Sequence, residues 1–363
     1  MSDFNILKRT EAKKTFRVAS IIGKFDLQSD IVEESFTGNI DLDSDWQIGV
    51  IVGASGTGKT TIAKELFADA YVTTFDYSAS SIVDDMPSHC SVDEITKMFN
   101  SVGFSSPPSW LKPYSVLSNG QKMRVDLAKA MLSKNDLIVF DEFTSVVDRN
   151  VAKIGSYAVQ KAIRKTDKKF IAVTCHNDVV DWILPDWIFN TDNMTFQKLE
   201  GQKKNRPKIK FEIFQAADKY VWKVFAKHHY LSHTHNNSAH VYVAYVNNQL
   251  AGFISVLHLP HPRAKNIKMV HRLVVLPDYQ GVGIGVRLLE FIAKKYVKNE
   301  YRFKIVTSAP SLINYFKKST YWKCNHFGRQ SVGGTSGEIH NKNKENNSSS
   351  YKRITTSWEY DKK

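Results

Sequence analysis

Two glycine-rich stretches, more than two hundred residues apart, have the residue types and spacing of phosphate-binding loops. The first is GASGTGKTT, starting at Gly53, and the second is QGVGIG, from Gln280 to Gly285. Each follows an apolar, strand-like run and precedes a segment with helical periodicity. Backbone N–H groups at the start of a helix bind phosphate well, because the helix dipole adds to their positive charge. Two such loops predict two different phosphate-bearing ligands.

The first loop satisfies the G-x-x-x-x-G-K-T spacing and lies between IGVIVG and TTIAKELFADA. In this context Lys59 is expected to reach the β- and γ-phosphates of a nucleotide, and the Thr60 hydroxyl to ligate Mg²⁺. Downstream, DLIVFDEF is an apolar strand that ends in Asp141 and Glu142. Asp141 is the predicted second Mg²⁺ ligand, and Glu142 is predicted to polarise the water that attacks ATP. The predicted ATP contacts within this loop are Gly53, Ser55, Gly56, Gly58, Lys59, Thr60 and Thr61.

The segments around this strand resemble the motifs of ABC ATPases, in the same order along residues 15–195. VLSNGQKMRVDLAKAM resembles the signature loop, SVVDR the D-loop and VTCHND the switch histidine segment. The resemblance implies that a second protomer completes each ATP site and that Asp148 lies at the dimer interface. It also implies that His176 senses the γ-phosphate. The residues that would contact the partner's ATP are Ser118, Gly120 and Gln121.

Three features depart from the ABC pattern. Asn119 replaces the usual second glycine of the signature, and only 58 residues separate Lys59 from Ser118. No clear Q-loop glutamine lies in that interval. Because the sequence has no recognisable membrane domain, a transporter is not expected. Soluble ABC ATPases typically act on nucleic acid or ribosomes.

The second loop resembles the Q-x-x-G-x-G motif of GNAT acetyltransferases, because it follows MVHRLVVL and opens a helix. That resemblance covers about residues 211–360 and implies that the loop binds the pyrophosphate of acetyl-CoA. A dinucleotide fingerprint would need an acidic residue ending a second strand, whereas Glu300 precedes its strand. The predicted acetyl-CoA contacts are Leu273, Val274, Val275, Gln280, Gly281, Val282, Gly283, Ile284 and Gly285.

The acid or base for acyl transfer is less clear from the sequence. Many GNAT enzymes place a tyrosine in the helix after the next strand, but Phe316 occupies that slot here, and the adjacent Tyr315 should point elsewhere on a helix. Upstream, AKHHYLSHTHNNSAH packs five histidines into 13 residues. Histidine is the natural acid–base group at neutral pH. We therefore predict His229 as a catalytic group, while a metal site or a polar loop remain alternative interpretations of the cluster. Ser308, at the end of the strand before that helix, is a second predicted catalytic group that would protonate the leaving thiolate or position the substrate.

Charge is distributed unevenly along the 363 residues, whose formal net charge is +14. Residues 1–200 carry 22 basic and 27 acidic side chains, whereas residues 201–363 carry 28 and 9. This asymmetry favours a polyanionic partner, DNA above all, although a basic surface kept for solubility would also explain it. The polar N-terminus and the lack of a long apolar run indicate the cytoplasm.

The expected fold class is α/β in two domains: an ABC-type P-loop ATPase with a parallel-sheet core at 1–202, and a mixed α/β GNAT fold at 203–363. GQKKNRPKIK is the predicted linker, 328–350 a flexible basic loop, and RITTSWEY a final strand. Asn247-Asn248 is a predicted hairpin turn and FQAADKYVWKVFAKHHY a helix-like segment.

Three functions remain open. The HHYLS-type segment and the terminal SWEY strand resemble phage Mom-type DNA-modifying enzymes, which implies an ATP-driven homodimeric clamp that acylates a DNA base from acetyl-CoA. The same domains could instead acetylate a protein lysine or a small amine, with ATP as a switch. A third possibility is a DNA-binding ATPase whose GNAT half is a silent sensor.

Overall fold

The computed structural model describes residues 2–27, 31–72, 75–199, 209–229, 233–262, 264–329 and 354–361. Contacts divide the chain into two compact units. The first contains residues 1–78, 86–102 and 118–207, and the second contains residues 79–85, 103–117 and 208–363. Two short segments of the N-terminal half thus group with the C-terminal half. The predicted boundary between residues 202 and 203 and the predicted linker lie almost wholly outside the described residues.

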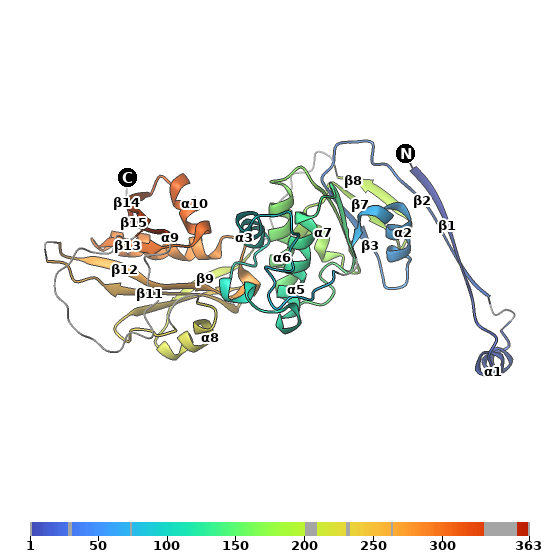
Figure 1. Cartoon of the computed structure of the whole chain (residues 1–363), viewed down its shortest axis with the longest axis horizontal. Coiled ribbons are helices and arrows are strands. Elements are labelled where there is room, and N and C mark those ends of the chain that lie inside the picture. Colours follow the sequence, from blue (N-terminus) through green and yellow to red (C-terminus); the bar gives the residue numbers. More distant parts are fainter. Residues whose placement is uncertain are drawn as a thin grey trace. The chain divides into compact units, whose positions relative to one another are not determined.

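The first unit is built on a six-stranded sheet in the order β4-β5-β6-β3-β7-β8, in which the strands from β4 to β7 are parallel (Figure 1). Its centre is apolar on both faces, as parallel sheets covered by helices are; all five residues of β3 are buried. The α/β fold with a parallel-sheet core is therefore confirmed. The strands are β3 (Ile48–Val52), β4 (Tyr71–Val72), β5 (Leu137–Phe140), β6 (Lys169–Thr174), β7 (Trp187–Asn190) and β8 (Thr195–Lys198).

The helices of this unit follow the expected α/β alternation. The strand IGVIVG is followed by α2, as the first loop predicted, and β5 ends at the residue before Asp141. The helical bounds are α2 (Lys59–Leu66), the 3₁₀ turn η1 (Ala68–Ala70), α3 (Val92–Ser101), α5 (Asn119–Leu132), α6 (Arg149–Ile163) and α7 (Asp178–Ile183).

A long hairpin at the N-terminus was not foreseen in the sequence. Strands β1 (Ser2–Glu11) and β2 (Ile31–Ile40) pair antiparallel along their whole length, and α1 (Phe16–Phe25) lies between them in the chain. At one end of the hairpin, Phe4 and Phe36 are buried in the same cluster as Phe189. At the other end, no residue of α1 is buried. Among the described residues, the hairpin is therefore anchored to the sheet at one end only.

The second unit contains a seven-stranded mixed sheet in the order β14-β15-β13-β12-β11-β10-β9. All neighbours are antiparallel except β12 and β13, which are parallel. The strands are β9 (Phe211–Gln215), β10 (His240–Val246), β11 (Gln249–His258), β12 (Ile267–Val275), β13 (Arg302–Thr307), β14 (Trp322–Arg329) and β15 (Ile354–Tyr360). The helical elements are α4 (Pro107–Trp110), η2 (Tyr114–Val116), η3 (Lys219–Val221), α8 (Trp222–Ala226), η4 (Pro277–Tyr279), α9 (Ile284–Lys298) and α10 (Pro310–Lys318).

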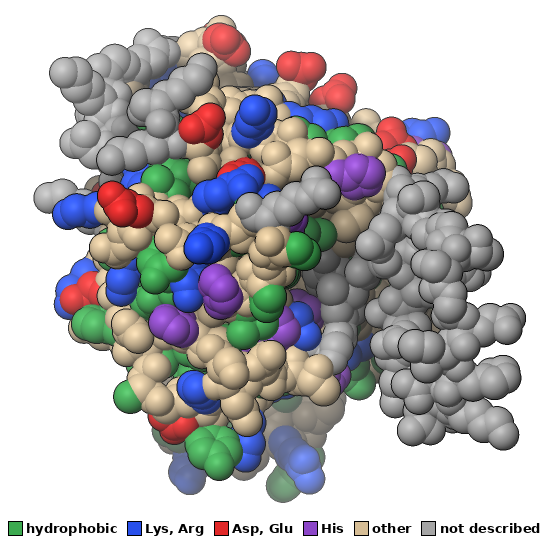
Figure 2. Space-filling view, turned by 90° about the vertical axis from the view of Figure 1, so that its left-hand side faces the viewer, with side chains coloured by type: hydrophobic (Ala, Val, Ile, Leu, Met, Phe, Trp, Pro, Cys, Tyr) green, Lys and Arg blue, Asp and Glu red, His purple; other side chains and the backbone are tan. Residues whose placement is uncertain are grey.

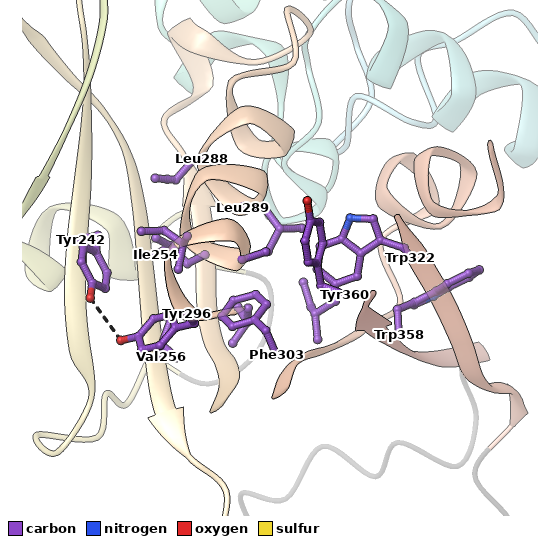
Figure 3. Packing of buried hydrophobic residues seen from close by; sticks show 14 of the residues in the cluster. Tyr242, Ile254, Val256, Leu288, Leu289, Tyr296, Phe303, Trp322, Trp358 and Tyr360 are labelled. Carbon is purple, nitrogen blue, oxygen red and sulfur yellow. Dashed lines mark hydrogen bonds between the residues drawn. The ribbon is translucent and has the colours of Figure 1, made fainter. Parts of the chain in front are cut away.

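The main core of this unit lies between the sheet and α9. Leu288, Leu289 and Ile292 of α9 lie in one buried cluster with aromatic residues of β10, β13, β14 and β15 (Figure 3). The hydroxyl oxygens of Tyr242 and Tyr296 lie 3.1 Å apart inside this cluster and satisfy each other. Burial of these large rings supplies the apolar area that holds α9 on the sheet. The helix, and with it the second glycine-rich loop, is therefore rigidly placed.

Several local predictions are confirmed and one is corrected. Asn247 and Asn248 have φ of 48° and 67° between β10 and β11, which is the left-handed geometry of a two-residue hairpin turn. RITTSWEY forms β15. The expected helix-like segment is much shorter than its sequence pattern, because Phe214 and Gln215 end β9 and the α-helix covers only Trp222–Ala226. At Phe214 and Gln215 the chain pairs with β10 as a strand, although the sequence has helical periodicity. Of the loop expected at 328–350, all but its first two residues lie outside the described residues.

Candidate functional site

The predicted nucleotide residues follow three neighbouring parallel strands. Strand β6 lies between β3 and β5, and the glycine-rich loop, Asp141-Glu142 and His176 come directly after the ends of β3, β5 and β6. Because the carboxyl ends of parallel strands meet at one edge of a sheet, these residues gather at the same edge. This is the position at which open α/β sheets bind their ligands.

The two predicted Mg²⁺ ligands are in direct contact. The Thr60 hydroxyl donates to a carboxylate oxygen of Asp141 at 2.8 Å. Adjacent ligands of an octahedral Mg²⁺ with bonds of about 2.1 Å lie about 3 Å apart. The two oxygens therefore fit one cation without a large movement. Lys59, the expected phosphate-binding cation, donates to the Ala54 carbonyl at 2.5 Å across the loop.

The backbone of the first loop has the conformation that a phosphate cradle needs. Gly56 and Gly58 both have φ of 86°, which favours glycine, and a Cβ at Gly56 would meet no atom within 4 Å. A Cβ at Gly58 would lie 2.3 Å from the ring of Phe36. Glycine at 58 is thus required by both backbone and packing, whereas the space at 56 is open to a ligand.

The helices that follow the two glycine-rich loops differ from α3, α5 and α6 at their first turn, although α4, α7, α8 and α10 also lack a side-chain cap. Serines 91 and 118 form capping boxes at α3 and α5, and Asp148 caps α6. In contrast, the N-cap residues of α2 and α9 are Gly58 and Gly283, and neither helix has a side-chain cap. Four N–H groups at a helix start lack partners within the helix. At α2 and α9 no capping side chain competes with a phosphate for them.

Three residues near the ATP site were missed by the sequence reasoning. Asp192, just after β7, accepts the Ala54 N–H at 2.7 Å, and the hydroxyls of Thr191 and Thr57 lie 2.5 Å apart. The Tyr71 hydroxyl donates to the same Asp141 oxygen that Thr60 contacts. Burial, followed by this carboxylate, raises the Tyr71 pKa well above its usual value. The signal in the sequence was faint: a Thr-Asp pair at the end of one more apolar strand.

The predicted signature and D-loop residues cap helices in the single chain. Ser118 and Gln121 bond each other's backbone N–H groups, at 3.4 and 3.1 Å. The Asp148 carboxylate accepts the Asn150 N–H at 2.8 Å. Glu142 is exposed and has φ of 51°, a rare conformation that occurs at functional sites when the surroundings enforce it. Contacts of these residues with a second protomer's ATP remain predictions.

The second site lies where β12 and β13 separate. The two strands pair only through Ile267–Met269 and Arg302–Lys304, so the ladder stops before Leu273–Val275, the predicted acetyl-CoA segment. Ser308 follows β13 at the same end of the pair. Strands that diverge leave backbone N–H and C=O groups without ladder partners, and a ligand can use them. The geometry fits an elongated molecule inserted between the two strand ends.

The second glycine-rich loop continues from this opening. Gly281 and Gly283 have φ of 85° and 88°, and a Cβ at Gly283 would meet nothing within 4 Å. The Gln280 amide donates to the Val275 carbonyl at 2.8 Å and accepts the Ser105 N–H at 2.7 Å, which belongs to the same unit. The glutamine thereby fixes the loop to the end of β12. These residues fit the pyrophosphate of acetyl-CoA, with the orphan amides of α9 as donors.

In the helix after β13, neither Phe316 nor Tyr315 supplies the hydroxyl that many GNAT enzymes place there. Phe316 is 1% exposed and packs on Trp322 and Trp358, with ring centroids 4.7 and 5.3 Å away. The Tyr315 hydroxyl donates to the Glu290 carboxylate at 2.6 Å and so points toward α9. Burial, followed by that carboxylate, raises the Tyr315 pKa to about 12. Both placements agree with the expectation that the usual tyrosine is missing.

The histidine cluster is divided between surface and interior. His229 is 7% exposed and lies edge-on to Trp222 at 5.8 Å, whereas His233 and His240 are exposed. His235 and His271 face each other, with ring centroids 5.5 Å apart. Among the residues that the structure describes, no group of three His, Cys, Asp or Glu side chains could hold a metal ion. The catalytic roles of His229 and Ser308 stay predictions.

Family comparisons match both halves of the chain. A model of the acetyltransferase (GNAT) family matches residues 208–319, and a model of the AAA ATPases, a family associated with various cellular activities, matches residues 50–179. The chain therefore contains a P-loop ATPase domain and a GNAT acetyltransferase domain. In the described residues, no helix is long and apolar enough to cross a membrane.

Two curated proteins resemble part of the chain. Elongation factor 3 of Gonapodya prolifera is 25% identical over 181 residues, which cover 42% of this chain and 16% of the relative. The [NU+] prion formation protein 1 of Saccharomyces cerevisiae is 35% identical over 101 residues, which cover 28% and 8%. The chain thus spans less than a fifth of the length of these relatives.

Two solved structures each align with part of the chain at low similarity. A bacterial ABC transporter cassette described as dimeric is 16% identical, with a TM-score of 0.39. The match covers 54% of this chain and 100% of the cassette. The Escherichia coli ribosomal-protein-S18-alanine N-acetyltransferase is 13% identical, with a TM-score of 0.30, and covers 42% of this chain and 93% of its own.

Proposed function

We propose that this chain, a P-loop ATPase domain joined to a GNAT acetyltransferase domain, transfers an acetyl group from acetyl-CoA to an amine on a nucleic acid base. The observation that carries the proposal is the uncapped, glycine-lined start of α9 in the half of the chain that holds 28 basic and only 9 acidic residues. An acetyl donor binds through its pyrophosphate, and a nucleic acid through its phosphates. The basic C-terminal half would therefore attract both the acetyl donor and the nucleic acid.

The basic side chains of this half are spread out rather than concentrated. Figure 2 shows Lys and Arg side chains distributed over one face, with His side chains between them. Such a distribution suits contacts with several phosphates along a backbone. It gives affinity that falls steeply with salt, because each neutralised phosphate releases counterions.

We assign the ATPase half to the ABC type, and we infer that it closes as a homodimer on ATP. The support comes from the signature segment at Ser118, the D-loop residue Asp148 and the switch residue His176, all in ABC order. Thr60 and Asp141 would hold Mg²⁺, and Glu142 would polarise the attacking water. An ATP-bound dimer would clamp the duplex while a base leaves its stack, which costs a few kcal/mol.

In the acetyl-transfer half, Leu273–Val275 and Gln280–Gly285 would hold acetyl-CoA, and His229 and Ser308 would handle protons. When bound, the coenzyme supplies an acetyl thioester. The narrower proposal is an activity like that of phage Mom-type enzymes, with adenine in DNA as the acceptor. Its support is the sequence likeness of the His228-containing segment and of β15.

The deciding experiment is mass spectrometry of nucleosides from DNA of cells that express the full chain. We expect an acyl-modified nucleoside that disappears with Gly283→Asp, which blocks the acetyl-CoA loop, and decreases with Lys59→Ala. Purified protein should also bind duplex DNA with a steep salt dependence. If the acetyl group is found on protein lysine and on no nucleoside, the chain is a protein acetyltransferase instead.

A further inference from the structure

A β-bulge in β12 gathers polar side chains on one face of the second unit's sheet. Ser255 of β11 pairs with Arg272, but the next residue, Val256, pairs with Val270, so His271 has no partner in the ladder. A bulge of this kind locally re-aims a side chain and often borders an active site. The His271 ring consequently meets His235, on the face that Trp222 and Phe253 also cover.

The segment that carries His235 is held against this face by hydrogen bonds. The Trp222 indole donates to the His233 carbonyl at 2.7 Å, and Arg272 donates to the Thr234 carbonyl at 3.1 Å. The Asn236 N–H donates to Nε2 of His271 at 3.3 Å. These bonds connect α8 and β12 to one segment, residues 233–238. His235 is thus positioned by the sheet and not by its own loop alone.

Two polar atoms in this place have no hydrogen-bond partner among the described residues. They are Nε2 of His235 and the hydroxyl of Ser255, and both are shielded from solvent. Ser255 is 0% exposed, and by strand alternation it faces the same side as Phe253, which contacts the His235 ring. Buried polar groups normally have partners, because an unmade hydrogen bond costs about 1–3 kcal/mol. Two such groups at one site indicate a place for a polar ligand atom.

The surroundings keep both imidazole rings neutral. Nε2 of His271 accepts the Asn236 N–H at 3.3 Å, and the Arg272 guanidinium lies 3.4 Å from Nδ1; a protonated ring could accept no hydrogen bond and would place its charge beside that guanidinium. Burial, Arg272 and His235 lower the His271 pKa to about 4. Burial, Arg272 and Lys219 likewise lower the His235 pKa below its usual value. The charged and titratable groups that face the pair are Arg272 of β12, Lys219 of η3 and His229 after α8.

We propose that His235, in place of the His229 expected from the sequence, is the catalytic residue that accepts the proton of the acceptor amine, and that this amine arrives uncharged. The inference rests on the acetyl-transfer function proposed above. His271 is a positioning residue that holds His235 and keeps it unprotonated. A protonated lysine would be repelled by Arg272 and Lys219, whereas an exocyclic base amine carries no charge. The site thus favours a nucleobase over a lysine.

The step balances in atoms and protons. The acceptor nitrogen attacks the carbonyl carbon of the acetyl thioester, the N–C bond forms and the C–S bond breaks. The nitrogen's proton passes to Nε2 of His235, which is shielded from solvent. His235 then passes a proton to the thiolate of coenzyme A, so that coenzyme A leaves as a thiol. His271 lies two residues before Leu273, or about 7 Å along the strand, so the pair is close to the predicted acetyl position.

The first test measures protonation without any turnover. In full-length protein labelled at histidine Cε1, the resonances are assigned with His235→Gln and His271→Gln, then titrated by NMR. We expect both rings to titrate below 6.5, with His271 near 4. Titration of both rings at or above 6.5 would overturn the inference, because they would then be charged at neutral pH.

The second test measures acetyl transfer from acetyl-CoA to an adenine-containing oligonucleotide between pH 5 and 9. Because a base must be neutral, kcat/KM should rise with pH through the lowered pKa and be constant above about 6.5. His235→Gln should lower kcat/KM about 100-fold or more and abolish this acidic limb, while acetyl-CoA binds as before. His271→Gln should shift the limb to higher pH or weaken it, and His258→Gln, the matched control, should change nothing.

The outcomes separate this inference from the proposed function. If the oligonucleotide is acetylated but His235→Gln keeps the rate and the pH profile, His235 is not the base. If poly-lysine is a better acceptor than the oligonucleotide, the uncharged-amine assignment is wrong. If the unmodified protein binds no acetyl-CoA, the proposed function fails, and the inference fails with it.

Discussion

Gly283→Asp tests the second loop most directly, because the structure separates its steric and electrostatic effects. A Cβ at this position meets no atom within 4 Å, so the fold has space for a side chain. The φ of 88° remains unfavourable for non-glycine residues, at about 1–2 kcal/mol, with Asn and Asp tolerated best. Gly283→Asn is therefore the matched control: it has nearly the same shape and backbone cost without the charge.

The charge should dominate the loss of acetyl-CoA binding. Gly283 is half-buried at the start of α9, where an effective dielectric constant of about 20 applies. Two unit negative charges about 4 Å apart then repel by about 4 kcal/mol, which weakens binding by about three orders of magnitude. Calorimetry on full-length protein should show this loss of acetyl-CoA affinity for Gly283→Asp and a much smaller loss for Gly283→Asn.

Two results would refute this reasoning. Equal losses for Asp and Asn would mean that shape and not charge matters, so no phosphate lies near Gly283. Unchanged affinity in both variants would mean that this loop does not bind acetyl-CoA. Thermal unfolding of both variants checks that the fold is retained.

Three further predictions concern other parts of the molecule. Glu142→Gln should slow ATP hydrolysis and trap an ATP-bound dimer, because the amide cannot polarise water but leaves the nucleotide contacts intact; an unchanged monomer with Mg-ATP in sedimentation would contradict the ABC assignment. Phe316→Tyr should lower stability by about 1–3 kcal/mol in denaturant unfolding without raising activity, because its hydroxyl would be buried beside Trp322 and Trp358, whereas Tyr315→Phe loses only the bond to Glu290. Burial raises the pKa of Glu359, but the hydrogen bonds from Arg302 and Asn325 outweigh it and lower the pKa to about 2. Glu359 therefore contributes stability that is present above about pH 4.3 and is lost as the pH falls toward 2. The difference in free energy of unfolding between the unmodified protein and Glu359→Gln should therefore shrink over that pH range. A constant difference would mean that the charged Glu359–Arg302 pair does not stabilise β15.

The sequence alone determined the features that depend on local order along the chain. Loop spacing, the apolar strand before each loop and the helix after it predicted both candidate phosphate-binding loops and their strand–loop–helix setting, because backbone cradles need glycine at fixed offsets. The Asn247-Asn248 turn and the strand at RITTSWEY were equally local. Thr60 and Asp141, although 81 residues apart, do lie in contact, as expected from motifs that follow neighbouring strands; their role as Mg²⁺ ligands stays a prediction.

Only the tertiary structure decided which side chains meet across the sheet. The cluster of five histidines predicted acid–base chemistry, but not that His235 would face His271, which is 36 residues away and re-aimed by a bulge that the sequence pattern does not show. Thr191 and Asp192 escaped notice for the same reason, since their contacts with the first loop depend on β7 lying beside β3. The helical pattern at Phe214 likewise yielded to strand pairing with β10. Register and neighbouring strands are set by packing of the whole sheet, and no single segment contains that information.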